Sequence, residues 1–224
     1  MKTIRKQTLC LMAIVFASGA YFHLLYAAEE TNAISAEQAL QILKDGNDRF
    51  AADRSEQKDL NQKRRQELVK GQQPIAVVLA CADSRVAPEL IFNQGLGDIF
   101  VLRVAGNIAD PFVLGSMEYA VEHLHAPLLV VLGHEKCGAV AAAMEVEKPG
   151  GNLGMVVNDV YVGRQLTEKT EAGLSAAVKN NVLRQVELTT SHSDVLKKAV
   201  EEKRLKIVAG VYHLDSGKVE WFDK

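Results

Sequence analysis

Short apolar runs alternate with amphipathic segments along most of the chain. Three of these runs are uninterrupted and rich in β-branched residues and leucine, at residues 74–80, 98–104 and 128–132. Such runs are typical of strands that are buried on both faces of a parallel sheet. Ser35 begins a capping box with Gln38 and predicts a helix that extends to about residue 52. Asp110-Pro111 predicts the start of another helix, which runs to Leu124.

The strand at 98–104, the helix after Asp110 and the strand at 128–132 follow one another closely. This order predicts a right-handed βαβ crossover in a parallel sheet. Residues from about 153 to 203 are predicted to be mostly helical. The last segment, 207–222, contains a Ser216-Gly217 turn between two strand-like runs. The sequence therefore predicts an α/β fold with a mainly parallel sheet flanked by helices and a C-terminal edge strand with a hairpin.

The first residues differ in character from the rest. Lys2, Arg5 and Lys6 form a basic start, and residues 7–28 contain no acidic residue, no lysine and no arginine. This pattern is typical of a secretory signal. We expect cleavage after Ala27, a single domain over residues 28–224, and a periplasmic location without stable membrane insertion. The alternative is an uncleaved anchor, because the run approaches the roughly 20 residues that span a bilayer.

Composition limits the classes of function. The chain has 224 residues, of which 48% are hydrophobic and 24% charged, with a formal net charge of -2. These values are typical of one globular domain and exclude the basic surface needed for nucleic acid or for an anionic membrane. Three cysteines in the whole chain exclude a disulfide-dense secreted module. Cys81 and Cys137 remain after the predicted cleavage, and in an oxidising compartment they are also candidates for one disulfide.

The ends of two predicted strands carry metal-binding residue types. Cys81 follows the first strand, while His134 and Cys137 follow the third. Ligands in open α/β sheets collect at the carboxyl ends of the strands, so we expect the two thiols and the imidazole to converge. Two cysteines and one histidine with an open fourth position are typical of a catalytic zinc site. Zinc would also protect both thiolates from forming the disulfide.

Asp83 and Arg85 lie close to the first cysteine in a Cys-x-Asp-x-Arg sequence. One interpretation is a salt bridge that stabilises the turn. The other is a carboxylate that accepts a proton from zinc-bound water and is held by the guanidinium. Water bound to zinc has a pKa near ~7, so hydroxide is available at neutral pH.

Taken together, these motifs resemble those of the β-class carbonic anhydrases, in order and in spacing. The resemblance includes four motifs: Cys81-Ala82-Asp83-Ser84-Arg85-Val86, the segment from Gly95 to Asn107, Ser116-x-Glu118-Tyr119-Ala120, and Gly133-His134-x-x-Cys137-Gly138. It implies an enzyme that hydrates CO2 reversibly to bicarbonate and a proton by means of zinc-bound hydroxide.

The resemblance also implies roles for individual residues. Cys81, His134 and Cys137 would bind one zinc ion per subunit. Asp83 and Arg85 would form the catalytic pair, and Asp83 is a possible fourth zinc ligand in a closed state. Family members are dimers or tetramers whose active sites lie at the dimer interface. The segments at 35–52 and 57–70 would accordingly pack on the partner of a homodimer or tetramer.

Substrate-binding residues follow from the same resemblance. Gln72 stands where plant-type members have a glutamine that donates to bicarbonate. Phe100 and Tyr119 match the apolar wall of the pocket, and Ala105 replaces a valine there. Val78 occupies the position at which bicarbonate-inhibited members have a tryptophan, so we expect their inhibitory site to be absent or altered.

Two other functions are compatible with the same residues. One is a related zinc hydrolase that acts on CS2 or COS, because zinc hydroxide attacks either molecule. The other is a non-catalytic, zinc-stabilised dimeric binding module, which the presence of Asp83 and Arg85 disfavours. His123 lies four residues after Tyr119 on one helix face and is either a proton relay or an ordinary surface residue.

Overall fold

Within residues 34–163 and 169–222, which the computed structural model describes, five strands form one sheet in the order β2-β1-β3-β4-β5. The strands are β1 (Ala76–Ala80), β2 (Ile99–Arg103), β3 (Leu128–His134), β4 (Lys206–Tyr212) and β5 (Val219–Phe222). The predicted signal segment lies outside the described residues.

Four of the strands are parallel, and β5 alone runs antiparallel, beside β4. The predicted α/β fold with a mainly parallel sheet is confirmed. The predicted C-terminal edge strand with a hairpin is also confirmed, since β5 lies at one edge of the sheet and pairs with β4. One detail differs: β2 forms the other edge, although its apolar run predicted burial on both faces. β4 lies between β3 and β5, and the carboxyl half of β4 is buried.

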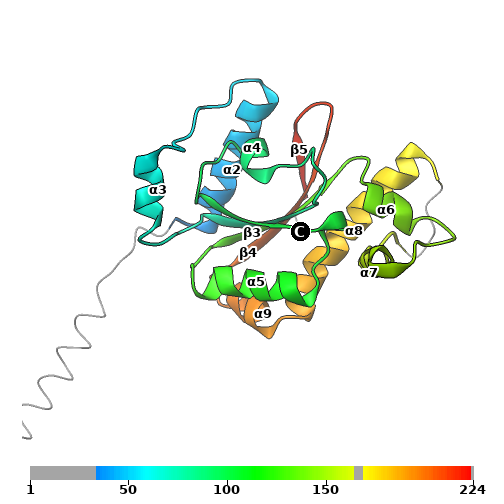
Figure 1. The fold of residues 1–224 in the computed structure, drawn as a ribbon. Coiled ribbons are helices and arrows are strands. Elements are labelled where there is room, and N and C mark those ends of the chain that lie inside the picture. Colours follow the sequence, from blue (N-terminus) through cyan, green and yellow to red (C-terminus); the bar gives the residue numbers. More distant parts are fainter. Residues whose placement is uncertain (1–33, 164–168, 223–224) are drawn as a thin grey trace, which may run out of the picture. The chain divides into compact units, whose positions relative to one another are not determined.

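Helices cover both faces of the sheet (Figure 1). α2 and α4 lie on one face, and α5, α8 and α9 lie on the other, with α6 and α7 beside the end of α8. The helices are α2 (Ala36–Ala51), α3 (Gln62–Leu68), α4 (Pro88–Ile91), α5 (Pro111–Glu122), α6 (Gly138–Ala143), α7 (Gly151–Asp159), α8 (Glu171–Ser191) and α9 (Asp194–Glu201), together with the 3-10 turn η1 (Ala105–Asn107).

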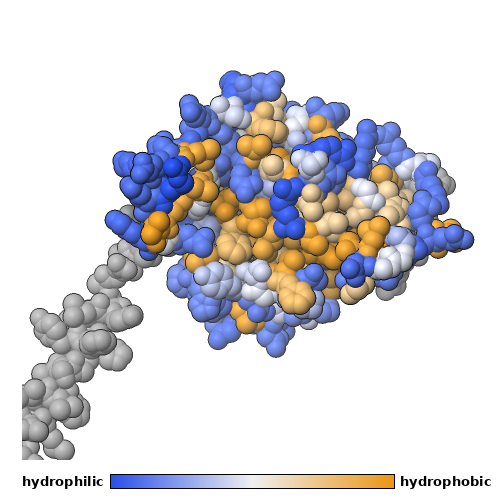
Figure 2. All heavy atoms as spheres, viewed as in Figure 1, coloured by the Kyte–Doolittle hydropathy of each residue, from blue (hydrophilic) through white to orange (hydrophobic). Residues whose placement is uncertain are grey.

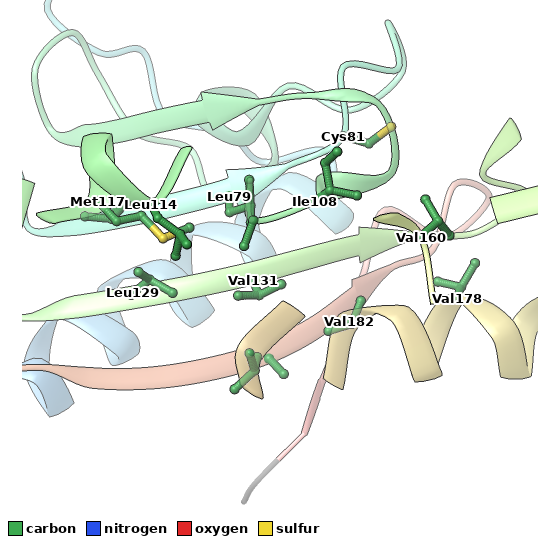
Figure 3. Close-up of a cluster of buried hydrophobic side chains, with 14 of the residues drawn as sticks. Leu79, Cys81, Ile108, Leu114, Met117, Leu129, Val131, Val160, Val178 and Val182 are labelled. Atoms are coloured by element: carbon green, nitrogen blue, oxygen red, sulfur yellow. The ribbon is translucent and has the colours of Figure 1, made fainter. Parts of the chain in front are cut away.

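The sheet separates two apolar clusters. The larger contains Leu79, Leu129 and Val131 from the strands, with the helices α5 to α9 packed against them. Figure 3 shows Cys81 at one end of this cluster, and the valines Val178 and Val182 of α8 facing the sheet. Burial of this size stabilises the domain at roughly 25 cal/mol per Å² of apolar surface, so a disulfide is not needed to hold the fold together.

α2 begins at the predicted capping box, in which the Ser35 side chain accepts from Gln38 N and the Gln38 side chain accepts from Ser35 N. Its apolar side, with Ala39 and Leu43 fully buried, packs on the second cluster beside Phe92. We predicted that this helix packs on a partner subunit. In the structure Ala39 and Leu43 face its own sheet, so a partner would contact the other sides of α2, and this packing stays a prediction.

Asn47 connects α2 to the far end of the chain. Its amide donates to the carbonyl oxygens of Ile91 (3.2 Å) and Gly217 (2.8 Å), and its oxygen accepts from Val219 N at 2.8 Å. Asn47 is buried, and these three bonds satisfy its amide. The N-terminal helix and the C-terminal hairpin are therefore held to one another.

The polar segment predicted at 57–70 is helical only at α3, which begins at the N-cap Asn61 and buries none of its residues. α7 begins at Gly151, two residues before the region that was predicted to be mostly helical. Over residues 34–163 and 169–222, no helix combines the length and the apolar character that a bilayer crossing requires.

Candidate metal centre

Parallel pairing of β1 with β3 brings the predicted metal ligands together. Ala80 and Leu132 are register partners, so the residues that follow them leave the sheet at the same edge. Cys81 comes directly after β1, His134 is the last residue of β3, and Cys137 is the N-cap of α6. All three are buried, and their ligating atoms lie within 4.8 Å of one another. Among the described residues, no other group of three histidine, cysteine or acidic side chains converges in this way.

The turn between His134 and Cys137 depends on one unusual backbone conformation. Lys136 has a φ of 52°, in the left-handed region that residues other than glycine rarely adopt. This conformation reverses the chain immediately after β3. It allows the imidazole at the strand end and the thiol at the helix start to face the same point.

The two cysteines are free thiols whose sulfur atoms lie 4.0 Å apart. A disulfide requires a sulfur–sulfur distance of about 2.05 Å, so the structure does not contain the alternative disulfide. A separation of 4.0 Å is compatible with two thiolates that bind one ion, since each Zn–S bond measures about 2.3 Å.

The imidazole of His134 is oriented by its own backbone. Nδ1 lies 2.8 Å from the carbonyl oxygen of Glu135, which can only accept, so Nδ1 carries the proton and donates. Nε2 therefore carries the lone pair. This atom is fully buried and has no hydrogen-bond partner. A buried acceptor without a partner is costly, and a metal ion bound by the three residues would satisfy it. The donor set and this lone pair fit zinc.

The thiols polarise one another. The hydrogen bond from Cys137 holds the pKa of Cys81 well below its usual range, and the His134 imidazole and the Gly106 N–H (3.4 Å from Sγ) act in the same direction. The same hydrogen bond to Cys81 raises the pKa of Cys137, and burial adds to that effect. Cys81 is therefore the thiol that ionises first, and a cation between the two sulfurs would favour ionisation of both.

Asp83 and Arg85 form a two-point ion pair beside this cluster. Arg85 Nε donates to Asp83 Oδ1 at 2.9 Å and Arg85 Nη2 to Oδ2 at 2.7 Å, while the Arg85 backbone N–H also donates to Oδ1. These bonds hold the pKa of Asp83 far below its usual range. Asp83 Oδ2 also lies 3.9 Å from His134 Nε2. The carboxylate thus lies next to the position that an ion would occupy.

The predicted substrate-binding residues are placed less uniformly. Ala105 lies in η1, directly before the glycine that contacts the Cys81 sulfur. Phe100 and Tyr119 contact each other, with ring centroids 6.4 Å apart. Phe100 pairs with Val77, three register positions before Ala80, so it lies roughly 10 Å along the sheet from the strand ends.

Gln72 is not brought to the cluster of its own chain. Gln72 precedes β1, whereas Cys81 follows that strand, so the two residues lie at opposite ends of β1. The side chain is exposed and borders a groove formed with Gly97 and Ile99. The role of Gln72 in binding substrate stays a prediction, as do the roles of Phe100, Tyr119 and Ala105. His123 contacts Tyr119, with ring centroids 5.3 Å apart, as their helical spacing predicts.

Sequence reasoning missed the part that Arg103 plays in the site. Its Nε donates to the carbonyl oxygen of Cys81 at 3.1 Å and its Nη2 to that of Asp83 at 2.6 Å. Arg103 ends β2, whose carboxyl end lies at the same edge of the sheet as those of β1 and β3. A charged residue at the end of an otherwise apolar strand was the signal that could have revealed it.

Comparisons with known proteins relate the chain to one enzyme family. A family model described as carbonic anhydrase matches residues 76–219. Carbonic anhydrase 2 of Mycobacterium tuberculosis is 42% identical over 193 residues, which cover 84% of this chain and 92% of that protein. The carbonic anhydrase of Mycolicibacterium smegmatis is 42% identical over 192 residues, covering 81% and 91%.

Solved structures resemble the chain over a similar length. The β-carbonic anhydrase CcaA has a TM-score of 0.65 and is 25% identical, with 82% of this chain and 95% of that chain covered. The Coccomyxa β-carbonic anhydrase, solved in complex with acetazolamide, has a TM-score of 0.64 and is 26% identical, covering 83% and 85%.

Proposed function

The chain belongs to the β-class carbonic anhydrase family, and from this premise we propose that it binds one zinc ion per subunit and catalyses the reversible hydration of CO2 to bicarbonate and a proton. The observation that carries the proposal is the buried cluster of Cys81, His134 and Cys137 with the Asp83–Arg85 pair beside it. Zinc held by these three residues would supply a Lewis acid that makes water a nucleophile near neutral pH.

Asp83 would orient the attacking water rather than take its proton. The sequence left two interpretations of this carboxylate, a salt-bridge partner in the turn and a proton acceptor. Its depressed pKa makes it a weak base, since Arg85 stabilises the anionic form through two side-chain hydrogen bonds. A carboxylate of this kind accepts a hydrogen bond and fixes the direction of a lone pair. The proton released by the reaction would then pass to solvent or buffer.

Stopped-flow CO2 hydration by the purified protein, with metal content measured on the same sample, tests the proposal. We expect hydration that saturates with CO2 and one zinc per chain. CS2 and COS serve as competing substrates. A zinc-loaded protein that hydrolyses either sulfur compound faster than it hydrates CO2 would establish the related hydrolase instead. A zinc-loaded protein that is inactive on all three would establish the binding module.

We further propose that the chain forms a homodimer through the side of the sheet bounded by β2. This edge strand pairs only with β1, and its residues Phe100, Val101 and Leu102 are half-buried. Figure 2 shows a band of apolar residues on the surface at the height of the sheet, between α4 above and α5 below as Figure 1 places them. Phe112 and Tyr119 of α5 are among the exposed large apolar residues. Exposed apolar edges of this kind are normally covered.

A partner at this edge would also explain where the predicted pocket residues lie. Gln72, Phe100 and Tyr119 lie away from the metal cluster of their own chain, on the side where a partner would bind. Sedimentation equilibrium of the purified protein is expected to give the mass of a dimer or of a pair of dimers. A monomer at micromolar concentration with full CO2 hydration activity would refute the proposed interface.

For the N-terminus, we propose export to the periplasm with cleavage after Ala27. The support is the basic start and the uncharged apolar run of residues 7–28. N-terminal sequencing of the protein from fractionated cells is expected to begin at Ala28 in the soluble periplasmic fraction. An intact Met1 in the membrane fraction would establish the uncleaved anchor.

A further inference from the structure

α8 carries two amide side chains that are fully buried against the sheet. Asn181 and Gln185 have no exposed surface, although α8 packs on β3 and β4 with valines such as Val178 and Val182. Burying an amide in an apolar layer is unfavourable unless every donor and acceptor is satisfied. Alanine or valine would suffice for packing alone. The two buried amides therefore indicate that the fold requires their hydrogen bonds.

Their hydrogen bonds end on the backbone of the turn that contains η1. Asn181 Nδ2 donates to the carbonyl oxygen of Gly106 at 2.8 Å, and Gln185 Oε1 accepts from the N–H of Ala109 at 2.8 Å. Gln185 Nε2 donates to Asn181 Oδ1 at 3.0 Å, which links the two amides. They therefore hold both ends of the segment 106–109, although about 75 residues of chain separate the partners.

A second segment is held by the same pair. Asn181 Oδ1 also accepts from Tyr161 N at 3.0 Å, and Gln185 Nε2 also donates to the carbonyl oxygen of Asp159 at 3.2 Å. This segment supports the turn directly, because a Cβ added to Gly106 would lie 2.7 Å from Val160 Cγ2. Gly106 has a φ of 74° and little room to move.

The turn has a direct contact with the metal centre. The N–H of Gly106 donates to the sulfur of Cys81, with a distance of 3.4 Å between nitrogen and sulfur. The direction of this N–H is determined by the conformation of the turn. Asn181 holds the carbonyl oxygen of the same residue. The side chain of Asn181 is thus connected to Cys81, a predicted zinc ligand, through the backbone of Gly106 alone.

We propose that Asn181 and Gln185 are positioning residues of the metal centre, which hold the 106–109 turn so that the Gly106 N–H hydrogen-bonds the Cys81 thiolate. This inference rests on the proposed zinc site. Hydrogen bonds to a thiolate stabilise its charge, and they lower the energy of the sulfur electrons that a metal accepts. Partners of metal ligands typically contribute about 10- to 100-fold to metal affinity.

The test compares Asn181→Leu with the control Thr189→Val in the full protein. Thr189 is fully buried on the same helix, but its hydroxyl donates only to Val186 O within α8. We expect Asn181→Leu to bind zinc about 10- to 100-fold more weakly, measured by competition with a chelator. In the cobalt-substituted protein its sulfur-to-cobalt charge-transfer band should move to longer wavelength. Thr189→Val should leave both quantities unchanged while losing thermal stability.

The proposal can also be tested if Asn181→Leu does not fold, with a second variant and with a measurement on the unaltered protein. Gln185→Met is close in shape and should show the same changes. In the unaltered protein loaded with ¹¹³Cd, the Gly106 amide proton should show scalar coupling to the metal through the sulfur. Unchanged zinc affinity and an unchanged cobalt band in either folded variant would overturn the proposal, as would absence of the coupling. Failure of the unaltered protein to bind zinc would refute the proposed function instead.

Discussion

Replacement of Cys137 by serine is expected to abolish zinc binding and to lower the rate of CO2 hydration by more than about 10²-fold. Loss of a residue that only hydrogen-bonds a metal ligand typically costs about 10- to 100-fold, so loss of a ligand itself should cost more. Cys137 is buried at the start of α6, and its sulfur lies 4.0 Å from that of Cys81. Serine keeps the volume but provides a hydroxyl that does not ionise near neutral pH. A single thiolate and one imidazole would then remain for the metal.

Metal analysis and stopped-flow assays of the same preparation measure this effect. Ala143→Ser is a matched control, since Ala143 is a buried small residue of the same helix. It adds a hydroxyl to α6 without changing the cluster and should retain zinc and activity. If Cys137→Ser retained one zinc per chain and full activity, the assignment of Cys137 as a ligand would be wrong. A mass two hydrogens lower without zinc in the unaltered protein would indicate a disulfide.

Arg85→Lys is expected to lower kcat/KM at neutral pH while zinc content stays constant. Lysine keeps the positive charge but loses the planar pair of donors that now reach both oxygens of Asp83, at 2.9 and 2.7 Å. The pKa of Asp83 would rise from its depressed position toward its ordinary value of about 3.9. The carboxylate therefore stays anionic above about pH 5, and protonation of Asp83 does not explain the effect.

The released carboxylate instead changes the pH profile through competition. Asp83 Oδ2 already lies 3.9 Å from His134 Nε2, so a small rotation would bring it to the position that a bound metal would occupy. There it would compete with water, and hydroxide would displace it more readily as the pH rises. The midpoint of activity should move upward by about one pH unit, which corresponds to about a tenfold loss on the acid side of the profile.

Complete pH–rate profiles of both proteins decide the matter. Arg204→Lys is the control, because Arg204 also donates to carboxylates, Glu202 at 2.9 Å and Glu122 at 3.1 Å, and none of these residues belongs to the predicted site. It should leave the profile unchanged. Superimposable profiles for Arg85→Lys and the unaltered protein would restrict Arg85 to the structural role of a salt bridge in a turn.

The sheet and the ligand cluster could be predicted from the sequence because their signals are local. The runs at 74–80 and 128–132 are buried over nearly their whole lengths, and their apolar character reflects this. The run at 98–104 is mostly half-buried, because β2 is an edge strand. Cys81 and His134 converge because parallel strands end at the same edge of a sheet. The motif spacing therefore carried the geometry of the centre.

Features that depend on distant contacts could not be predicted in the same way. The packing of α2 on its own sheet could not be read from the sequence, because an amphipathic pattern shows that a helix has an apolar side but not what covers it. The amide of Asn181 reaches Gly106 across 75 residues and has no local signature. The short helices α4 and α6 have too few turns for a periodic pattern to be recognised.

The bonds of Asn47 also determine the order in which the fold can be completed. One partner, Val219, lies 172 residues further along the chain, almost at its end. During synthesis α2 emerges before the other described elements, yet the amide of Asn47 lacks its final partners until the last strand is available. Native contacts of such long separation form late, because closing a long loop costs entropy. α2 thus completes its docking only with the β4–β5 hairpin, and a chain truncated before Val219 would leave Asn47 without that partner.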